Sequence, residues 1–500
     1  YKTEVNWDIP ADVPLEPEIY ETRYAYNALG EIIQQLTPDD STYRVTYDIA
    51  GYTQTIEAEF TDGSTQIFVE SIDYTAAGDR QIVRYGNGVR TENTFEWTTD
   101  RLSRIYTTRP AATRNGNTGT TVLQDILYTY DPVGNITSIS DSSYKTIFCD
   151  QQMVEPLSEY TYDALYRLVK ATGRQHHGIQ KDTHIYGFKQ TKFMPLCPVH
   201  PNDMDKLQKY TEFYTYDDSG NFTELQHVVP PSLLSSSWTR RMPVGPNSNW
   251  LVPPEGSQRI YDANGNMLDL DNLRGMQWSY NNMLARVDTI IREDCHSDSD
   301  YLGYDSGGKR IRKVSERYTN GGSITEVEEK IYLGSLEIKR QKKVSAQSTV
   351  TTLERQSLHI MDGDTRIAIT SYWPIDVYSR EATSEPRTFR FQLDNNLGSS
   401  CVEVTQNADI ISYEEYFPYG DTSVIAGENE AEVQPKDYRY SGKECDDSTG
   451  LYYYGARYYA PWIGRWISAD PSGPVDGPNI YAFVNGNPIT VVDSDGRGIS

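Results

Sequence analysis

The stretch YTYDPVGNITSIS, residues 128–140, decides the fold that this sequence predicts. Tyrosines alternate with other side chains, an aspartate and a glycine follow, and a second alternating run comes after them. Alternation is typical of a half-buried β-strand, and Asp followed by Gly is typical of a tight turn. The stretch therefore predicts a β-hairpin in which Gly134 supplies the positive φ of the turn.

The same phrase recurs along the 500-residue chain, which contains 39 tyrosines. A glycine lies four residues after the tyrosines at positions 26, 47, 74, 130, 216, 261 and 304. A further copy, YTYDALYRL from Tyr160, has Tyr166 where the glycine is expected. A single hairpin cannot bury its apolar face, so neighbouring hairpins must pair into a long antiparallel sheet that twists and spirals as it grows. With helical signals scarce, the repeat predicts an all-β fold.

Charge and hydropathy limit the partners of this chain. The formal net charge of −25 argues against nucleic acids and anionic membranes, because both bind basic surfaces. No apolar run is long enough to cross a bilayer, and the chain does not start with a charged and then apolar leader. We therefore expect no nucleic-acid partner and no membrane insertion.

The metal-binding residue types are scattered. The five cysteines are Cys149, Cys197, Cys295, Cys401 and Cys445. They form no CxxC pair, and their odd number leaves a free thiol, which we expect to act as a small buried hydrophobe. His176 and His177 lie in the polar segment GRQHHGIQKD, so we expect them to be solvated. We expect no metal and no cofactor.

Two aspartates near the C-terminus are candidates for acid–base chemistry. Asp470 in ADPSG and Asp493 in VVDSDG are 23 residues apart, and the segment NIYAFVNGNPI between them predicts a strand and a turn that can fold one aspartate back toward the other. Two adjacent carboxylates share a proton, and such a pair can hydrolyse an amide bond. The alternative is that both aspartates cap turns, as Asp before Pro or Gly often does.

The ordered phrases resemble the Rhs/YD-repeat family, and above all the shell-forming components of insecticidal ABC toxin complexes. The most specific phrases are IDYTAAGDRQIVRYGNGVRTENTFEW at 72–97 and YRYSGKECDDSTGLYYYGARYYAPWIGRW at 438–466. The resemblance implies a hollow β-shell over residues 1–430 and an Rhs-associated core over residues 431–500 that curls inward as a plug. It also implies a secreted protein, a C-terminal toxin or peptide as enclosed cargo, and a possible N-terminal shell half or pore-forming toxin subunit as partner.

The family also implies a self-cleaving site without a cofactor. Its catalytic set maps onto Asp470, Asp493 and Arg457, with the cut between Arg497 and Gly498. The second DPxG turn of the family reads DSDG here, so Ser494 replaces the proline. The same change adds Asp495, a carboxylate that can take over the catalytic role.

The aromatic segment before this site has two interpretations. Arg465 lies among the rings of GLYYYGARYYAPWIGRW, where it can stack on them and help to pack the plug against the shell, with an accessory role in the site as a further option. The rival interpretation is an exposed carbohydrate-binding platform.

Two other functions compete with a self-cleaving shell. The first is a non-enzymatic, teneurin-like adhesion or ligand-binding shell in which the aspartates are turn caps. The second is a glycan-degrading enzyme, suggested only by abundant carboxylates and aromatic residues. The NxT sequons at Asn135 and Asn221 overlap the repeat phrase, so chance explains them.

Overall fold

The computed structural model describes most of the chain, in thirteen ranges. These are residues 18–111, 113–114, 117–118, 121–149, 152–177, 206–231, 236–253, 260–270, 273–292, 296–319, 322–379, 387–427 and 436–499. Within them the regular elements are β-strands and three short 3₁₀ turns, and there is no α-helix. The prediction of an all-β fold built from long antiparallel sheets is confirmed. No helix in these ranges is long and apolar enough to cross a membrane.

The chain forms two compact units, each made of two separate sequence segments. The first unit combines residues 1–87 with residues 284–389, and the second combines residues 88–283 with residues 390–500. The predicted boundary between residues 430 and 431 lies outside the described residues. In both units strands that follow one another in sequence pair as antiparallel neighbours.

The first unit contains two runs of strands. The first run is β1 (Arg23–Tyr26), β2 (Ile32–Leu36), β3 (Thr42–Tyr47), β4 (Thr53–Glu59), β5 (Thr65–Tyr74) and β6 (Arg80–Tyr85). The second run is β21 (Leu284–Ile290), β22 (Asp298–Tyr304), β23 (Arg310–Thr319), β24 (Ile324–Leu333), β25 (Leu336–Val344), β26 (Thr349–Asp362) and β27 (Thr365–Asp376). The two runs contact each other: the hydroxyl of Tyr43 donates to the carbonyl oxygen of Met361, and Arg80 pairs with Asp362.

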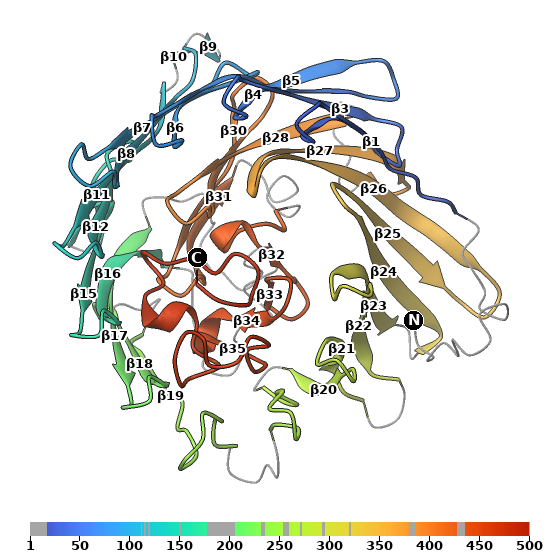
Figure 1. The fold of residues 1–500 in the computed structure, drawn as a ribbon. Coiled ribbons are helices and arrows are strands. Elements are labelled where there is room, and N and C mark those ends of the chain that lie inside the picture. The colour runs from blue at the N-terminus through green and yellow to red at the C-terminus, as the bar shows by residue number, and fades with distance from the viewer. Residues whose placement is uncertain are drawn as a thin grey trace. The chain divides into compact units, whose positions relative to one another are not determined.

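The second unit contains the remaining strands (Figure 1). Its first segment forms β7 (Arg90–Phe95), β8 (Leu102–Thr108), β9 (Thr113–Arg114), β10 (Asn117–Thr118), β11 (Val122–Tyr130), β12 (Ile136–Asp141), β13 (Ile147–Cys149), β14 (Gln152–Val154), β15 (Leu157–Tyr162), β16 (Leu168–His176), β17 (Leu207–Tyr216), β18 (Phe222–Val228), β19 (Trp238–Arg241) and β20 (Arg274–Trp278). Strand β28 (Arg387–Asp394) begins at the border of the units and is followed by β29 (Ser400–Val404), β30 (Ile410–Tyr416) and β31 (Thr422–Gly427).

The repeat phrase has one recurring geometry, and residues 130–135 show it. The Asp131 carboxylate accepts hydrogen bonds from the backbone N–H groups of Val133, Gly134 and Asn135, at 2.8–3.0 Å. The Tyr130 hydroxyl donates to the carbonyl oxygen of Leu102 at 2.7 Å. In this copy aspartate closes the turn and tyrosine ties it to an earlier strand of the sheet, which explains why the two residues recur together.

The tyrosine contact recurs in most copies of the phrase, and in the copy at Tyr261 the hydroxyl instead accepts the N–H of Leu251. Tyrosines that donate to a strand carbonyl in this way are Tyr47, Tyr74, Tyr130, Tyr162, Tyr216, Tyr304 and Tyr416. Tyr416 belongs to a copy, EEYFPYGDT, that the sequence analysis missed although Gly420 lies four residues after it. Tyr166 takes the place of the glycine with a left-handed φ of 63°.

The C-terminal elements form a separate four-stranded sheet inside the second unit (red in Figure 1). They are η3 (Tyr440–Gly442), β32 (Glu444–Cys445), β33 (Tyr452–Tyr453), β34 (Tyr458–Ala460), η4 (Pro461–Ile463), β35 (Arg465–Trp466) and η5 (Val484–Gly486). This segment binds the turns of the repeat strands. The side chain of Asn479 donates to the backbone carbonyl oxygen of Gly220, and the side chain of Asn487 donates to the side-chain oxygen Oδ1 of Asn135.

The aromatic residues of this segment are buried, which agrees with packing and not with an exposed carbohydrate platform. Tyr454, Tyr458, Tyr459 and Trp466 are each at most 2% exposed. The hydroxyl of Tyr459 donates to the carbonyl oxygen of Tyr419 at 2.8 Å, so the aromatic cluster is tied to the repeat strands.

The prediction of solvated histidines is wrong. His176 and His177 are 0% and 2% exposed, because β16 extends through His176 and pairs it with Leu207. Among the cysteines, Cys445 is buried, Cys149 and Cys401 are partly buried, and Cys197 and Cys295 lie outside the described residues. The local polarity of GRQHHG carries no information on the pairing with β17, which is what buries these histidines.

Candidate active site

Arg457 is the centre of the candidate site. It lies in the tight turn between β33 and β34 and is 3% exposed. Its Nη2 atom is 2.8 Å from Oδ2 of Asp470 and 3.3 Å from Oδ2 of Asp493. The structure thus brings together the three residues of the predicted catalytic set.

Other contacts fix the arginine in place. Its Nε donates to the carbonyl oxygen of Gly496 at 2.6 Å, and its guanidinium carbon lies 4.2 Å from the centre of the Trp466 ring. A planar cation held by two carboxylates, a carbonyl and an aromatic face has little freedom to move. Burial lowers the pKa of Arg457, and the charges of Asp470 and Asp493 oppose that effect.

Asp493 begins a tight turn that carries the predicted cleavage site. Its Oδ1 accepts the N–H groups of Gly496, at 2.7 Å, and Asp495, at 3.2 Å. Gly496 has a φ of +79°, and a Cβ there would lie 3.0 Å from the backbone nitrogen of Arg457. The turn therefore packs closely on the arginine, and glycine is the residue that fits.

The environment of Asp493 favours its protonated form. Burial raises the pKa of Asp493, and hydrogen bonds from Gly496 and Asp495 and the charge of Arg457 only partly offset that rise. Asp493 is 3% exposed, and the Asp470 side chain is 7% exposed. A buried carboxyl with a raised pKa beside a second carboxyl is an arrangement that can transfer protons.

The predicted bond between Arg497 and Gly498 lies in the same turn. Asp493 and Ile499 face each other as an antiparallel bridge, so the chain reverses between them. Arg457 contacts the carbonyl of Gly496, one residue before the predicted scissile carbonyl. An arginine in such a set can hold a carboxylate or polarise the scissile carbonyl, and the structure shows the first of these contacts.

The other two candidates lie outside the triad. Asp495 accepts the backbone N–H of Arg497 and pairs with its side chain at 3.1 Å, and both side chains are more than half exposed. Arg465 is 3% exposed, donates to the carbonyl oxygen of Asn249 and stacks on Tyr481 at 4.9 Å. Asp495 thus supports the turn, and Arg465 serves packing.

Two contacts on the turn were missed by the sequence analysis. Lys443 donates to the carbonyl oxygen of Ser494 at 2.6 Å, and Asp476 accepts the N–H of Ile499 at 3.1 Å. Lys443 lies in the phrase YRYSGKEC, which gave no indication of this contact, and Asp476 lies in a loop without a recognisable motif. For Asp476 the signal in the sequence was its nearness to Asp470.

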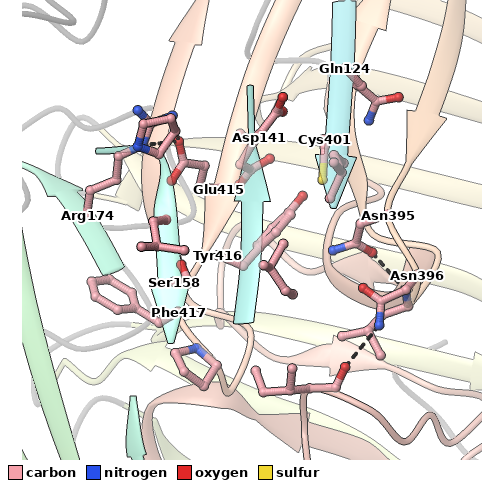
Figure 2. A pocket seen from close by; sticks show the side chains of 18 of the residues that line it. Gln124, Asp141, Ser158, Arg174, Asn395, Asn396, Cys401, Glu415, Tyr416 and Phe417 are labelled. Carbon is pink, nitrogen blue, oxygen red and sulfur yellow. Dashed lines mark hydrogen bonds and ion pairs between the residues drawn. The ribbon is translucent and has the colours of Figure 1, made fainter. Parts of the chain in front are cut away.

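A cavity of about 130 Å³ lies elsewhere in the same unit (Figure 2). Arg174 pairs with Glu415 at 2.5 Å in its wall, and Asp141 and Cys401 also line it. Burial raises the pKa of both Asp141 and Cys401. A protonated thiol is a poor nucleophile, so Cys401 is not activated for nucleophilic attack in this cavity.

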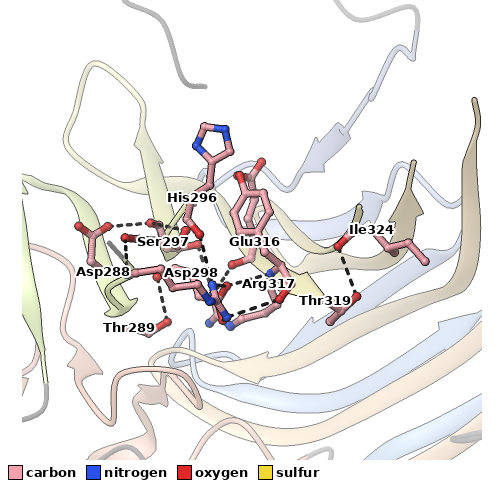
Figure 3. A network of polar contacts seen from close by, with 12 residues as sticks. Asp288, Thr289, His296, Ser297, Asp298, Glu316, Arg317, Thr319 and Ile324 are labelled. Atoms are coloured by element: carbon pink, nitrogen blue, oxygen red, sulfur yellow. Dashed lines mark hydrogen bonds and ion pairs between the residues drawn. The ribbon is translucent and has the colours of Figure 1, made fainter. Parts of the chain in front are cut away.

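A polar network in the first unit is a further cluster of charges (Figure 3). Arg292 binds Asp298, and Arg317 binds Asp300 at 2.8 Å. These acids are paired with arginines, which fits a structural role. Over the described ranges no group of three or more His, Cys, Asp or Glu is placed to hold a metal ion.

Comparisons with known proteins agree with this fold. No family model matches the sequence. Toxin subunit YenC1 of Yersinia entomophaga is 35% identical over 490 residues, covering 96% of this chain and 48% of that protein. Toxin subunit YenC2 of the same organism is 35% identical over 494 residues, with the same shares. The chain therefore spans about half the length of these curated relatives.

A solved structure shows the same similarity in three dimensions. The crystal structure of TcdB2-TccC3 superposes with a TM-score of 0.85 at 33% identity, over 99% of this chain and 23% of that one. The tyrosine and aspartate contacts described above explain how one repeat phrase builds such a sheet. On this evidence the chain belongs to the Rhs/YD-repeat family and has the fold of the shell of Tc toxin complexes.

Proposed function

We propose that this chain is part of a shell that encloses a C-terminal toxin or peptide and releases it by one cut in its own backbone, between Arg497 and Gly498. The observation that carries the proposal is the buried arginine that holds Asp470 and Asp493 beside the turn containing that bond. The similarity to proteins named as toxin subunits supports the enclosed cargo.

The proposed reaction needs only groups of this chain and one water molecule. Asp470 takes a proton from the water, whose oxygen attacks the carbonyl carbon of Arg497. Asp493, the carboxyl with the raised pKa, gives a proton to the nitrogen of Gly498. The C–N bond breaks and leaves a carboxylate on Arg497 and an amine on Gly498. Each chain reacts once.

In this mechanism Arg457 is a positioning residue. Its contacts with both carboxylates and with the Gly496 carbonyl fix the turn relative to the acid pair. Preorganised charge of this kind is effective because no reorganisation is needed at the moment of reaction.

The alternative is a binding shell, teneurin-like, in which the aspartates only cap turns. A specific observation favours it: Asp470 accepts the N–H of Ser472 at 2.8 Å, and Asp493 caps its own turn. Each aspartate, however, uses one oxygen for its turn and the other for Arg457. Turn capping and acid–base chemistry are therefore compatible, and only cleavage separates the two functions.

The proposed partners follow from the same assignment. We include the cargo segment beyond the cut, a further shell half and a pore-forming toxin subunit, all in a secreted assembly. Within the chain, residues 1–430 would build the shell and residues 431–500 the core that cuts. The net charge of −25 argues against nucleic acid as a partner.

Two measurements test this proposal. The full chain is extended after Ser500 by a soluble reporter, and its self-cleavage is followed at two concentrations a hundredfold apart. A cut within the same molecule gives one rate constant at both concentrations, whereas a concentration-dependent rate, or no cut, opposes the proposal. In the second measurement, protease is added to the reporter alone and to the cleaved reporter-extended chain. Enclosure protects the reporter in the second sample, so equal digestion in both samples would argue against enclosure.

A further inference from the structure

The segment around the proposed cut is held on both sides. Before the cut, Lys443 holds the carbonyl of Ser494, and the N–H of Ala456 donates to the carbonyl oxygen of Asp495 at 2.9 Å. After the cut, Asp476 accepts the N–H of Ile499 at 3.1 Å. A peptide bond between two fixed points is presented in one orientation.

Asp476 also lies against the residue that follows the cut. A Cβ placed on Gly498 would be 3.1 Å from Oδ2 of Asp476, closer than carbon and oxygen normally approach. The same oxygen accepts the N–H of Ile499, so the shift of a few tenths of an ångström that a Cβ would require also weakens that hydrogen bond. The φ of Gly498 is outside the left-handed region, so the obstacle to a larger residue is this carboxylate and not the backbone.

We propose that Asp476 positions the departing strand and restricts residue 498, the first residue after the cut, to glycine. This inference rests on the proposed self-cleavage between Arg497 and Gly498. It adds a residue outside the acid pair, because Asp476 contacts the product side of the bond, whereas Arg457 and Asp493 contact the preceding turn. Asp476 neither gives nor takes a proton in this role.

The cut gives the carboxylate a second use. Hydrolysis turns the amide of Gly498 into an amine, which is protonated near neutral pH. Asp476 is then the adjacent negative charge for the new ammonium group. The contact therefore favours the cut product over its reversal.

Three substitutions test the positioning role in the reporter-extended chain. Asp476→Ala removes the acceptor, and we expect cleavage to become about tenfold slower and to give products cut at more than one bond, because the strand is less well placed. Asp476→Asn keeps an oxygen acceptor and should restore a single product. Asp218→Ala, an exposed aspartate in another turn, is the matched control and should cleave like the wild type.

A double substitution tests the restriction to glycine. Gly498→Ala alone should cleave several-fold more slowly than the wild type. The double variant Gly498→Ala, Asp476→Ala should cleave as fast as Asp476→Ala alone, because the clash with the carboxylate has been removed. Independent, multiplicative losses would overturn the restriction.

The outcomes separate this inference from the proposed function. If the wild type cuts and Asp476→Ala cuts equally fast with one product, the inference is overturned and the proposed function stands. If the folded wild type does not cut, both are overturned together. Rescue by asparagine but not by alanine supports the positioning role, since a general loss of folding would affect both variants.

Discussion

Replacement of Lys436 by methionine is the most informative test of how the C-terminal segment is fixed to the repeat strands. Lys436 and Glu414 are each 0% exposed as side chains, and their Nζ and Oε2 atoms are 2.9 Å apart. Lys436 also donates to the carbonyl oxygen of Ser400 at 2.8 Å. Glu414 belongs to β30 and Ser400 to β29, so one lysine binds two strands.

The expected cost follows from the distances. Two charges 2.9 Å apart attract each other by about 6 kcal/mol at an effective dielectric constant of about 20, and dehydration of both ions offsets most of this gain. Removing one partner leaves a buried carboxylate and costs about 3 to 5 kcal/mol. Arg439, at 3.5 Å from Glu414, still compensates part of the charge. We therefore expect a loss near the lower limit, about 3 kcal/mol.

Hydrogen exchange at β29–β31 measures this loss. A decrease of about 3 kcal/mol in the local opening free energy accelerates exchange by about 100-fold. The double variant Lys436→Met, Glu414→Gln removes both charges and should recover most of the protection. Arg241→Met, which breaks an ion pair whose arginine side chain is 80% exposed, is the control and should change the free energy by less than about 1 kcal/mol.

The pH dependence of this stability loss is an independent test of the ion pair. Burial raises the pKa of Glu414, but Lys436 and Arg439 outweigh it, so the pKa is lowered overall. A glutamate whose pKa is lowered by folding stabilises the folded state at pH values above the ordinary pKa of a glutamate. This stabilisation is lost as the pH falls through the lowered pKa. The difference between the wild type and Lys436→Met should therefore be largest at neutral pH and should shrink in acid. Unchanged exchange in the variant at pH 7 would refute the reasoning.

Three further predictions follow from the site and the repeat. Because burial raises the pKa of Asp493, self-cleavage should accelerate as the pH is lowered toward that pKa, by up to about tenfold per pH unit, and a rate that instead rises with pH would contradict its role as the acid. Tyr130→Phe removes the hydrogen bond to the Leu102 carbonyl and should cost about 1 kcal/mol in a urea titration of the second unit, whereas no cost would mean that the tyrosine acts only through its ring. Gly420→Ala, at a φ of +96° with a Cβ 2.6 Å from the Tyr440 ring, should cost more than about 2 kcal/mol in the same assay, and a neutral result would show that the turn can relax.

The repeat made the fold predictable from local sequence. Asp131 and Gly134 encode one turn with their own side chain and backbone, and Tyr130 needs only a neighbouring strand. Pairings between distant segments could not be predicted in this way. The burial of His176 depends on its pairing with Leu207, which lies beyond a long intervening segment.

The candidate site was predictable in its residues but not in its contacts. The phrases around Asp470, Asp493 and Arg457 carried a family resemblance, and the structure brings these three side chains together. The contact of Arg457 with the Gly496 carbonyl and the anchor at Asp476 depend on how the last turn folds back. Neither has a spacing rule, so sequence alone could not reveal them.

Intact mass of the reporter-extended chain tests the central claim most directly, with the wild type compared with Asp470→Asn and Asp493→Asn. We expect the wild type to separate between Arg497 and Gly498 and each substitution to leave the folded chain whole. A folded wild type that stays uncut, or a cut that persists in both variants, would contradict it.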